Sequence, residues 1–550
     1  MAGGLLNIIS TGNNNAILTG NPTKTFFKVT YSKYTNFGLQ KFRIDYEGSR
    51  DLRLTDKSTF TFKMPRYAEL LMDTYLVITL PDIWSPIYQP CEQTSNLWSS
   101  YDFRWIRDLG THMITDVTIT CGSAILQKYS GEYLAAMVER DFTAEKKDLF
   151  NRMTGNVEEL YDPANAYGRM NAYPSAYTTS STAGAEPSIR GRSLYIPINT
   201  WFTLDSRCAF PMIALQYNEL YINVTLRPIQ ELFQVRDVFD RENFFPYVQP
   251  DFTYSQFQMY RYLQTPPSAN IDTASYQKKV NVWNADIHLI STYCFLSSDE
   301  AKQFAGQDQV YLIKDVFQYK FQNVTGTSQL SLTSNGMISS WMWYLQRDDV
   351  NLRNEWSNYT NWPYRSVPSE IYPAPFDIMT EYGPGKQPGI ANEGGETTTG
   401  IFITGDFTNM NQSEILVTMG ILLNGDYREN LLTSGVYDYI EKYTRTHGGA
   451  RNGLYCYNFC LNTNPLEYQP SGAINMSKFK DVYLEVTTIA PTIDLVNSSM
   501  DILCDGNGNP IAVRKNNWRL YEYNYNLTLF EERYNVLTFM GGNCSMLYAR

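Results

Sequence analysis

Alternation of apolar and polar positions dominates the chain and predicts β-strands. Residues 59–63 (TFTFK) and 116–121 (DVTITC) alternate at every second position, as strands with one buried face do. Residues 75–80 (YLVITL) form a continuous apolar run that stops at a proline, which is typical of a buried strand. Further strands are expected at 194–198, 220–226, 280–296, 310–321, 338–345, 415–423, 453–461 and 482–488.

One segment departs from this two-residue alternation. In residues 131–153 (GEYLAAMVERDFTAEKKDLFNRM) apolar side chains recur at helical spacing, at Leu134, Met137, Val138 and Phe142. This is the most helix-like piece of the chain, and we expect two short helices that are broken near Thr143.

Other segments carry the composition of loops. Residues 171–191 and 374–400 are rich in small, turn-forming residues and predict exposed loops. Residues 228–278 contain two proline-bearing stretches and are a candidate connector between domains. Residues 1–16 are mostly small and polar, so we expect an arm that a partner orders.

The stretch 17–46 follows this arm and opens the first run of strands. It begins with the turn Gly20-Asn21-Pro22 and continues into aromatic and β-branched residues interleaved with lysines. None of its residues looks like a nucleophile or a metal ligand. The composition favours a segment that packs on its own core and touches a neighbour.

A weak internal repeat suggests a duplicated β-domain. NELYINVT (218–225) matches KDVYLEVT (480–487) position by position, and DVTITCG (116–122) resembles GILLNG (420–425) more faintly. The two matches occur in the same order, which a single chance similarity would not produce. The first copy is longer between its two strands, and residues 131–191 can supply the difference.

Composition and charge narrow the range of possible functions. The 550 residues allow two to four domains, and the abundance of Tyr (42) and Phe (28) favours large sheets over helical bundles. The net charge of −11 repels phosphate backbones, so direct binding of nucleic acid is not expected. The eight cysteines include no CxxC pair, which favours reduced thiols and an intracellular folding site. Neither a signal peptide nor a transmembrane run is recognisable.

Candidate chemistry is sparse. The three histidines, His112, His288 and His447, are far apart in sequence and have no metal-ligand spacing. Cys456 and Cys460 would face the same side of one strand, but no second pair completes a metal site, and buried thiols are favoured. We therefore predict no catalytic residue, no metal site and no cofactor.

Three further patterns do not indicate a binding or catalytic site. DGNGNP (505–510) lacks the glycine and the final glutamate of a calcium loop, and GNPTKT (20–25) lacks the glycines of a phosphate loop. The adjacent carboxylates Glu158-Glu159 and Glu531-Glu532 are expected on the solvated surface. A carbohydrate-binding β-sandwich protein or a glycosidase stays open as an alternative, since glycosidases place two carboxylates across a β-rich cleft.

Eight N-x-[ST] sequences occur, at Asn223, Asn323, Asn358, Asn411, Asn475, Asn497, Asn526 and Asn543. Asn358 and Asn411 fall near predicted loops and are the candidates for glycosylation.

Seven segments in order along the chain carry a family resemblance: MAGGL (1–5), LTGNPTKTFFKVTYSKYTNF (18–37), FPMIALQYNELYINVTL (210–226), VYLIKDVFQYKF (310–321), ILLNGDYR (421–428), YNFCLNTNPLEYQPSGAINMS (457–477) and RYNVLTFMGG (533–542). The chain resembles the major capsid proteins of the nucleocytoplasmic large DNA viruses, which include phycodnavirus-, mimivirus- and iridovirus-like members.

This resemblance implies an all-β double jelly roll, two eight-stranded antiparallel sandwiches with short helices in long loops. The expected division is an inner arm (1–24), a first jelly roll (25–228), a connector (229–278) and a second jelly roll with the C-terminal segment (279–550). By the same analogy, 131–191 and 346–414 would be tower or trimer-contact loops.

The resemblance also implies a structural protein and its partners. The expected assembly is a homotrimer that tiles an icosahedral shell beside neighbouring capsomers. Minor capsid proteins would lie beneath the shell, with an inner viral membrane contacted indirectly. The expected location is the virion, assembled in the host cytoplasm.

Overall fold

The structure is a computed structural model. It describes residues 34–48, 51–88, 99–177, 185–238, 240, 245–267, 275–365, 412–467, 469–491, 493, 501–504, 510–514 and 518–548. The predicted arm 1–24, the predicted loop 374–400 and the glycosylation candidate Asn411 lie outside these residues.

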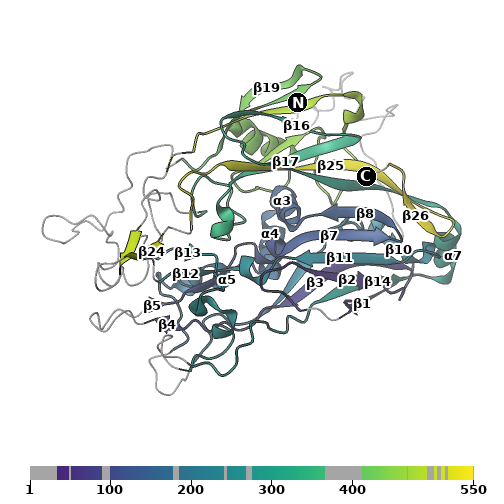
Figure 1. Cartoon of the computed structure of the whole chain (residues 1–550). Coiled ribbons are helices and arrows are strands. Elements are labelled where there is room, and N and C mark those ends of the chain that lie inside the picture. The colour runs from purple at the N-terminus through teal and green to yellow at the C-terminus, as the bar shows by residue number, and fades with distance from the viewer. Residues whose placement is uncertain are drawn as a thin grey trace, which may run out of the picture.

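The first sandwich consists of two facing antiparallel sheets (Figure 1). One sheet has the order β1 (Gly38–Asp45), β14 (His288–Phe295), β3 (Leu70–Thr79) and β9 (Ser193–Pro197), with the short β10 (Phe210–Pro211) also pairing with β3. The other has the order β2 (Ser58–Lys63), β11 (Leu220–Leu226), β7 (Ile114–Cys121) and β8 (Ala124–Tyr129).

The second sandwich repeats this arrangement. One sheet has the order β15 (Gln309–Phe321), β25 (Tyr525–Met540), β17 (Met337–Arg347) and β20 (Leu454–Asn458), extended by β21 (Ile474–Asn475) and β26 (Asn543–Met546). The other has the order β16 (Thr327–Ser331), β22 (Val482–Thr488), β18 (Leu416–Leu423) and β19 (Asp426–Thr433).

The two sandwiches have the same strand order, which confirms the predicted duplication. β11 and β22 both lie second in their sheets, and β7 and β18 both lie third. These are the strands that the two sequence matches paired. Alternate residues of β11 and of β22 are buried, so in both copies the period of two places one face on the core. The double jelly roll expected from the sequence is therefore the fold of the chain.

The predicted helical segment is also confirmed. It forms α3 (Gly131–Asp141) and α4 (Ala144–Thr154), separated near Thr143. The Ser130 hydroxyl oxygen accepts from the backbone N–H of Tyr133 and caps α3, while Gly155 ends α4 at φ 77°. The other α-helices are short: α2 (Leu109–Met113), α5 (Glu158–Tyr161), α6 (Trp201–Leu204), α7 (Ser298–Gly306) and α9 (Glu441–Arg445), preceded by one π-helical turn, η10 (Val436–Ile440).

Smaller strands lie outside the sandwiches. β6 (Phe103–Trp105), β12 (Phe233–Arg236) and β13 (Tyr247–Val248) form a three-stranded sheet, and β4 (Ile87–Tyr88) pairs with β5 (Ser99–Ser100). β23 (Asp501–Cys504) pairs with β24 (Pro510–Arg514). The loop expected to be exposed at 171–191 is partly buried: Ala176 is fully covered, and the Tyr173 hydroxyl donates to the Phe103 carbonyl at 2.8 Å. That part of the prediction was wrong.

One strand pairs differently from the predicted division of the chain. β14 lies within the range assigned to the second jelly roll, yet it pairs with β1 on one side and β3 on the other. It thus completes the first sandwich. Its local alternation predicted a strand, but a non-local pairing cannot be read from period alone.

Candidate functional site

Helix α3 lies between the two sandwiches, with β7 and β8 on one side and β17 and β25 on the other (Figure 1). All eleven of its residues are buried, although four of them are charged: Glu132, Glu139, Arg140 and Asp141. Buried charges are costly unless they are paired and hydrogen-bonded. The residues that pair with these four charges therefore show how the two jelly rolls are held together.

Arg140 is the centre of the first network. Its guanidinium donates to Asp141 Oδ2 at 2.7 Å, to Glu532 Oε1 at 2.9 Å and to Ser340 Oγ at 3.1 Å. Glu532 belongs to β25 and Ser340 to β17, both in the second sandwich. The Tyr133 hydroxyl also donates to Glu532 Oε1, at 2.8 Å. Arg140 and Glu532 thus pair across the junction, while Asp141 pairs with Arg140 on the same helix.

The charge of Glu532 is stable in this setting. Burial alone would raise the pKa of its carboxyl, but the positive charges of Arg140 and Lys314 and a hydrogen bond from Ser340 lower the pKa to about 2. Glu532 is therefore ionised at neutral pH and pairs with Arg140 as an anion.

Glu132 forms a second network at the other end of α3. Its Oε1 accepts from Arg227 at 3.0 Å, and its Oε2 accepts from Tyr344 at 3.1 Å and from Gln318 at 3.2 Å. Burial alone would raise the pKa of Glu132, but Lys320 and Arg227 lower it overall. Gln318, Lys320 and Tyr344 belong to the second sandwich, so this carboxylate also joins the two units.

A third set of contacts closes the C-terminal end of α3. The backbone N–H groups of Gly448 and Ala450 donate to the carbonyls of Arg140 and Glu139, each at 2.8 Å. Arg451 follows, and its guanidinium donates to Glu139 at 2.9 Å and contacts Asp108 at 2.8 Å. The second sandwich thereby supplies the partners that the last carbonyls of the helix lack.

Aromatic packing reinforces the junction. Phe210 of the first unit lies 5.2 Å from Phe539 of β25, with the rings nearly perpendicular. Trp201 lies 5.7 Å from Tyr311 of β15, and Tyr311 lies 5.7 Å from Phe539, both measured between ring centroids. The two contacts of Phe539 are edge-to-face and the Trp201–Tyr311 contact is tilted, and aromatic pairs in such arrangements are favourable. All four rings belong to one hydrophobic core that continues across both units.

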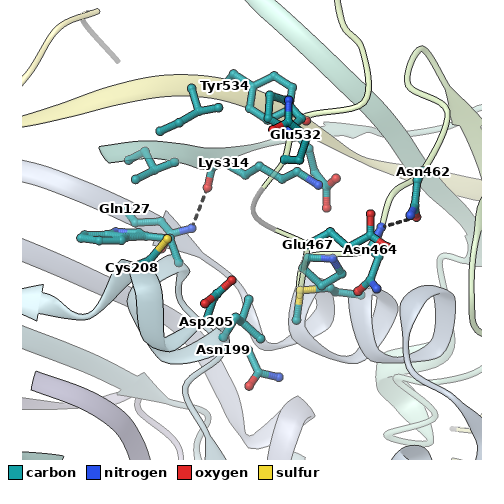
Figure 2. A pocket seen from close by; sticks show the side chains of 18 of the residues that line it. Gln127, Asn199, Asp205, Cys208, Lys314, Asn462, Asn464, Glu467, Glu532 and Tyr534 are labelled. Atoms are coloured by element: carbon teal, nitrogen blue, oxygen red, sulfur yellow. Dashed lines mark hydrogen bonds between the residues drawn. The ribbon is translucent and has the colours of Figure 1, made fainter. Parts of the chain in front are cut away.

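A polar pocket of ≈ 80 Å³ opens beside this cluster (Figure 2). Gln127 and Asp205 of the first unit face Lys314, Glu467 and Glu532 of the second. The Gln127 amide donates to the Lys314 carbonyl at 2.9 Å and crosses the pocket.

Two buried polar atoms at this pocket, Gln127 Oε1 and Trp201 Nε1, have no hydrogen-bond partner among the described residues. Water is the usual occupant of a polar space of this size, and it can bridge such groups. The pocket therefore suits ordered water between the two jelly rolls.

The candidate glycosylation residue Asn358 is fully buried. Its amide nitrogen donates to the carbonyls of Trp362 at 2.8 Å and Pro363 at 3.3 Å. Its Oδ1 accepts from the backbone and hydroxyl of Thr360. The folded chain therefore buries this nitrogen and engages it in hydrogen bonds, which argues against glycosylation at Asn358. For Asn411 the expectation stays a prediction.

The adjacent carboxylates Glu531 and Glu532 were expected on the surface, and this was wrong. Both are buried in β25 and point to opposite faces of the strand. Glu531 accepts from Trp341 Nε1 at 2.8 Å and pairs with Arg533 at 2.5 Å, whereas Glu532 faces Arg140. The two carboxylates therefore do not face one common site, and each has its own partners.

The thiols of Cys456 and Cys460 are buried, as expected. In the described part of the chain, no group of three or more His, Cys, Asp or Glu side chains is placed to hold a metal ion. The helices in that part are also too short or too polar to span a bilayer. The sequence missed the α3 networks because nothing local in a helix signals that its charges are buried.

Two family models match successive parts of the chain. "Major capsid protein N-terminus" matches residues 25–289, and "Large eukaryotic DNA virus major capsid protein" matches residues 300–545. The first match ends within β14, the last strand of the first sandwich, and the second match begins after that strand.

Several known proteins are similar to the chain over nearly its whole length. The chain is 24% identical over 545 residues to the major capsid protein of Phaeocystis pouchetii virus, covering 91% of this chain and 95% of the relative. It is 24% identical to the major capsid protein of Paramecium bursaria Chlorella virus 1, covering 100% of both. The crystal structure of PBCV-1 VP54 shares the fold with a TM-score of 0.59 at 18% identity, over 96% of this chain and 100% of that one. The resemblance inferred from the seven segments is thereby confirmed, and the chain belongs to the family of large eukaryotic DNA virus major capsid proteins.

Proposed function

We propose that this chain builds the icosahedral shell of a virion as a homotrimer with a pseudo-hexagonal outline. The observation that carries the proposal is the repetition of one sandwich in one chain, with both copies fixed side by side through α3. Three copies of such a pair present six similar sandwiches around one axis. A hexagonal outline then follows from a trimer, and hexagonal units tile the flat facets of an icosahedral shell.

A structural role fits the chemistry of the junction better than catalysis does. The buried carboxylates Glu132, Glu531 and Glu532 are occupied by cations and hydrogen-bond donors. Catalytic carboxylates of glycosidases instead face a substrate cleft across several ångströms. We propose that the chain is not an enzyme, and nothing observed favours the carbohydrate-binding alternative.

The proposed partners are those that a protein of an icosahedral shell would contact. Neighbouring capsomers would contact the trimer laterally, and minor capsid proteins would lie beneath it, between the shell and any inner membrane. We propose virion location after assembly in the host cytoplasm, with residues 1–24 as an inner arm. The negative net charge argues against direct contact with nucleic acid. The first jelly roll is proposed to run from residue 25 through β14, as the pairing of that strand supports.

Light scattering of the purified full-length chain on a sizing column tests the assembly. We expect a stable species of about three times 63.3 kDa that added sugars do not change. Electron micrographs of concentrated protein, or of the source particle, should then show a hexagonal lattice. A monomer that binds or cleaves a glycan would overturn the proposal.

A further inference from the structure

The C-terminal hairpin of the second jelly roll is attached to the first jelly roll. The turn between β25 and β26 contains Gly542, whose carbonyl accepts from the backbone N–H groups of Gln216 at 2.9 Å and Tyr217 at 3.3 Å. Asn218 Nδ2 then donates to Asn543 Oδ1 at 3.3 Å. The start of β26 is therefore held beside residues 216–218 of the first unit.

The end of β7 lies at the same place. Cys121 is the last residue of β7 and pairs with Leu220 of β11. The next residue, Gly122, donates its N–H to the carbonyl of Glu219 at 3.1 Å. Residues 218–220 thus lie between the C-terminal hairpin and the end of β7, and they bring Cys121 close to Cys544.

The two thiols are neighbours in the core. Cys121 and Cys544 are 1% and 5% exposed and belong to the same hydrophobic core, and each thiol is near enough to perturb the pKa of the other. A disulfide requires Cβ atoms about 4 Å apart. Neighbouring thiols on two strands that backbone pairing holds in place need little backbone movement to reach this distance. The residues are far apart in sequence, so the spacing of cysteines along the chain could not reveal the pair.

We propose that Cys121 and Cys544 are an oxidation site, at which a small-molecule disulfide such as oxidised glutathione links the two jelly rolls covalently. One thiolate attacks the external disulfide, forms a mixed disulfide and releases one reduced thiol. The second cysteine attacks the protein sulfur of that mixed disulfide and releases the other reduced thiol. In total, two protein thiols are oxidised, one external disulfide is reduced, and two protons pass to the two released thiols.

The position of the pair explains how an oxidant reaches it and what the link does. β26 is a four-residue strand that pairs only with β25 among the described strands, so it can open locally without unfolding the sandwich. Once formed, the bond closes a very long loop of chain and restricts the unfolded state. A reducing cell interior keeps the thiols free, and an oxidising exterior favours the link. This inference rests on the geometry of the chain and does not depend on the proposed shell.

The test uses the full-length protein in a series of glutathione buffers, from fully reduced to fully oxidised. One set of samples is incubated folded, and a second is refolded from urea in the same buffers. Free thiols are then alkylated, and the unreduced protein is digested and mapped by mass spectrometry. We expect a peptide pair joining Cys121 to Cys544 in the oxidised samples, two alkylations fewer than in the reduced ones, and a thermal midpoint about 2–4 °C higher.

Three serine variants provide the controls. Cys121→Ser and Cys544→Ser should each lose the linked peptide and the thermal shift, whereas Cys208→Ser, a buried thiol elsewhere in the first unit, should keep both. The wild-type peptide map stands even if a variant folds poorly. The inference is overturned if both thiols stay alkylatable in folded and refolded oxidised samples. It is equally overturned if they carry glutathione without being joined, or if either pairs with another cysteine.

Discussion

The guanidinium of Arg140 donates a 2.9 Å hydrogen bond to Oε1 of Glu532, and neither side chain is more than 2% exposed. Arg140 lies on a helix of the first jelly roll, and Glu532 lies on the central strand β25 of the second. The two jelly rolls are therefore joined by an ion pair that water does not reach. Such a pair adds little stability over an apolar contact, but its loss is costly because a charge is left buried alone.

Replacing Arg140 with methionine should destabilise the chain strongly. The variant keeps the apolar part of the side chain but leaves Glu532 and Asp141 without their cation. We expect a loss of about 3–5 kcal/mol in the free energy of unfolding, measured as a lower urea midpoint at pH 7.

Arg152→Met is the matched control for Arg140→Met. Arg152 forms an exposed pair with Asp148 on α4, and such pairs contribute about 0–1 kcal/mol. Equal urea midpoints for the two variants would show that the buried network does not hold the junction.

Gly448 and Gly449 give a second matched pair. A Cβ on Gly448 would lie 2.5 Å from the carbonyl oxygen of Arg140, while a Cβ on Gly449 would meet nothing within 4 Å. Gly448→Ala should therefore push the 446–450 loop away from α3 and cost about 1–3 kcal/mol. Gly449→Ala should change the free energy of unfolding by less than about 0.5 kcal/mol. Thermal midpoints of the two variants, measured side by side, decide whether the close approach matters.

Local patterns predicted the elements well. The period of two identified β2, β7 and β11, and the change of period at residue 131 identified α3 and α4 with the break at Thr143. These signals are local, because burial of one face of a strand or helix fixes the spacing of its apolar residues. The repeat could be found for the same reason: equivalent strands in two sandwiches face equivalent cores.

The contacts between the two halves could not be predicted in the same way. Glu132, Glu139 and Arg140 look like an ordinary solvated helix face, and their burial depends on β15, β17 and β25, which lie far away in sequence. The pairing of β14 with β1 and β3 is non-local too. A charged residue carries no sequence signal that its partner comes from another sandwich, so the junction appears only in three dimensions.

His112 makes stability depend on pH in the mildly acidic range. It is fully buried, and both ring nitrogens lack hydrogen-bond partners among the described residues. Burial lowers its pKa from 6.5 to about 4, despite the neighbouring charge of Asp108. Between these two values the unfolded chain binds more protons than the folded chain. Stability is therefore complete above pH 6.5 and falls as the pH drops toward 4, by about 3 kcal/mol in total.

Urea titrations at several pH values between 4 and 7 measure this slope. In His112→Leu the part of the slope that comes from this imidazole should disappear. His447→Leu, which replaces a half-exposed histidine, should leave the slope as in the wild type. An unchanged slope in His112→Leu would assign the pH dependence to other groups.

Asn358 should act as a structural amide and carry no glycan. Its buried side chain takes part in four hydrogen bonds with residues 360–363, so Asn358→Ala should cost about 2 kcal/mol or more. Thr360→Ala destroys the same N-x-[ST] sequence but keeps the asparagine and most of its bonds, so it should cost only about 1 kcal/mol. Equal losses of unfolding free energy in the two variants would mean that removal of the N-x-[ST] sequence, and not of the amide, destabilises the chain. A glycan on the Asn358 peptide of the folded protein would point the same way. Because the amide nitrogen already donates to two backbone carbonyls, we expect neither result from unfolding curves and peptide mass mapping.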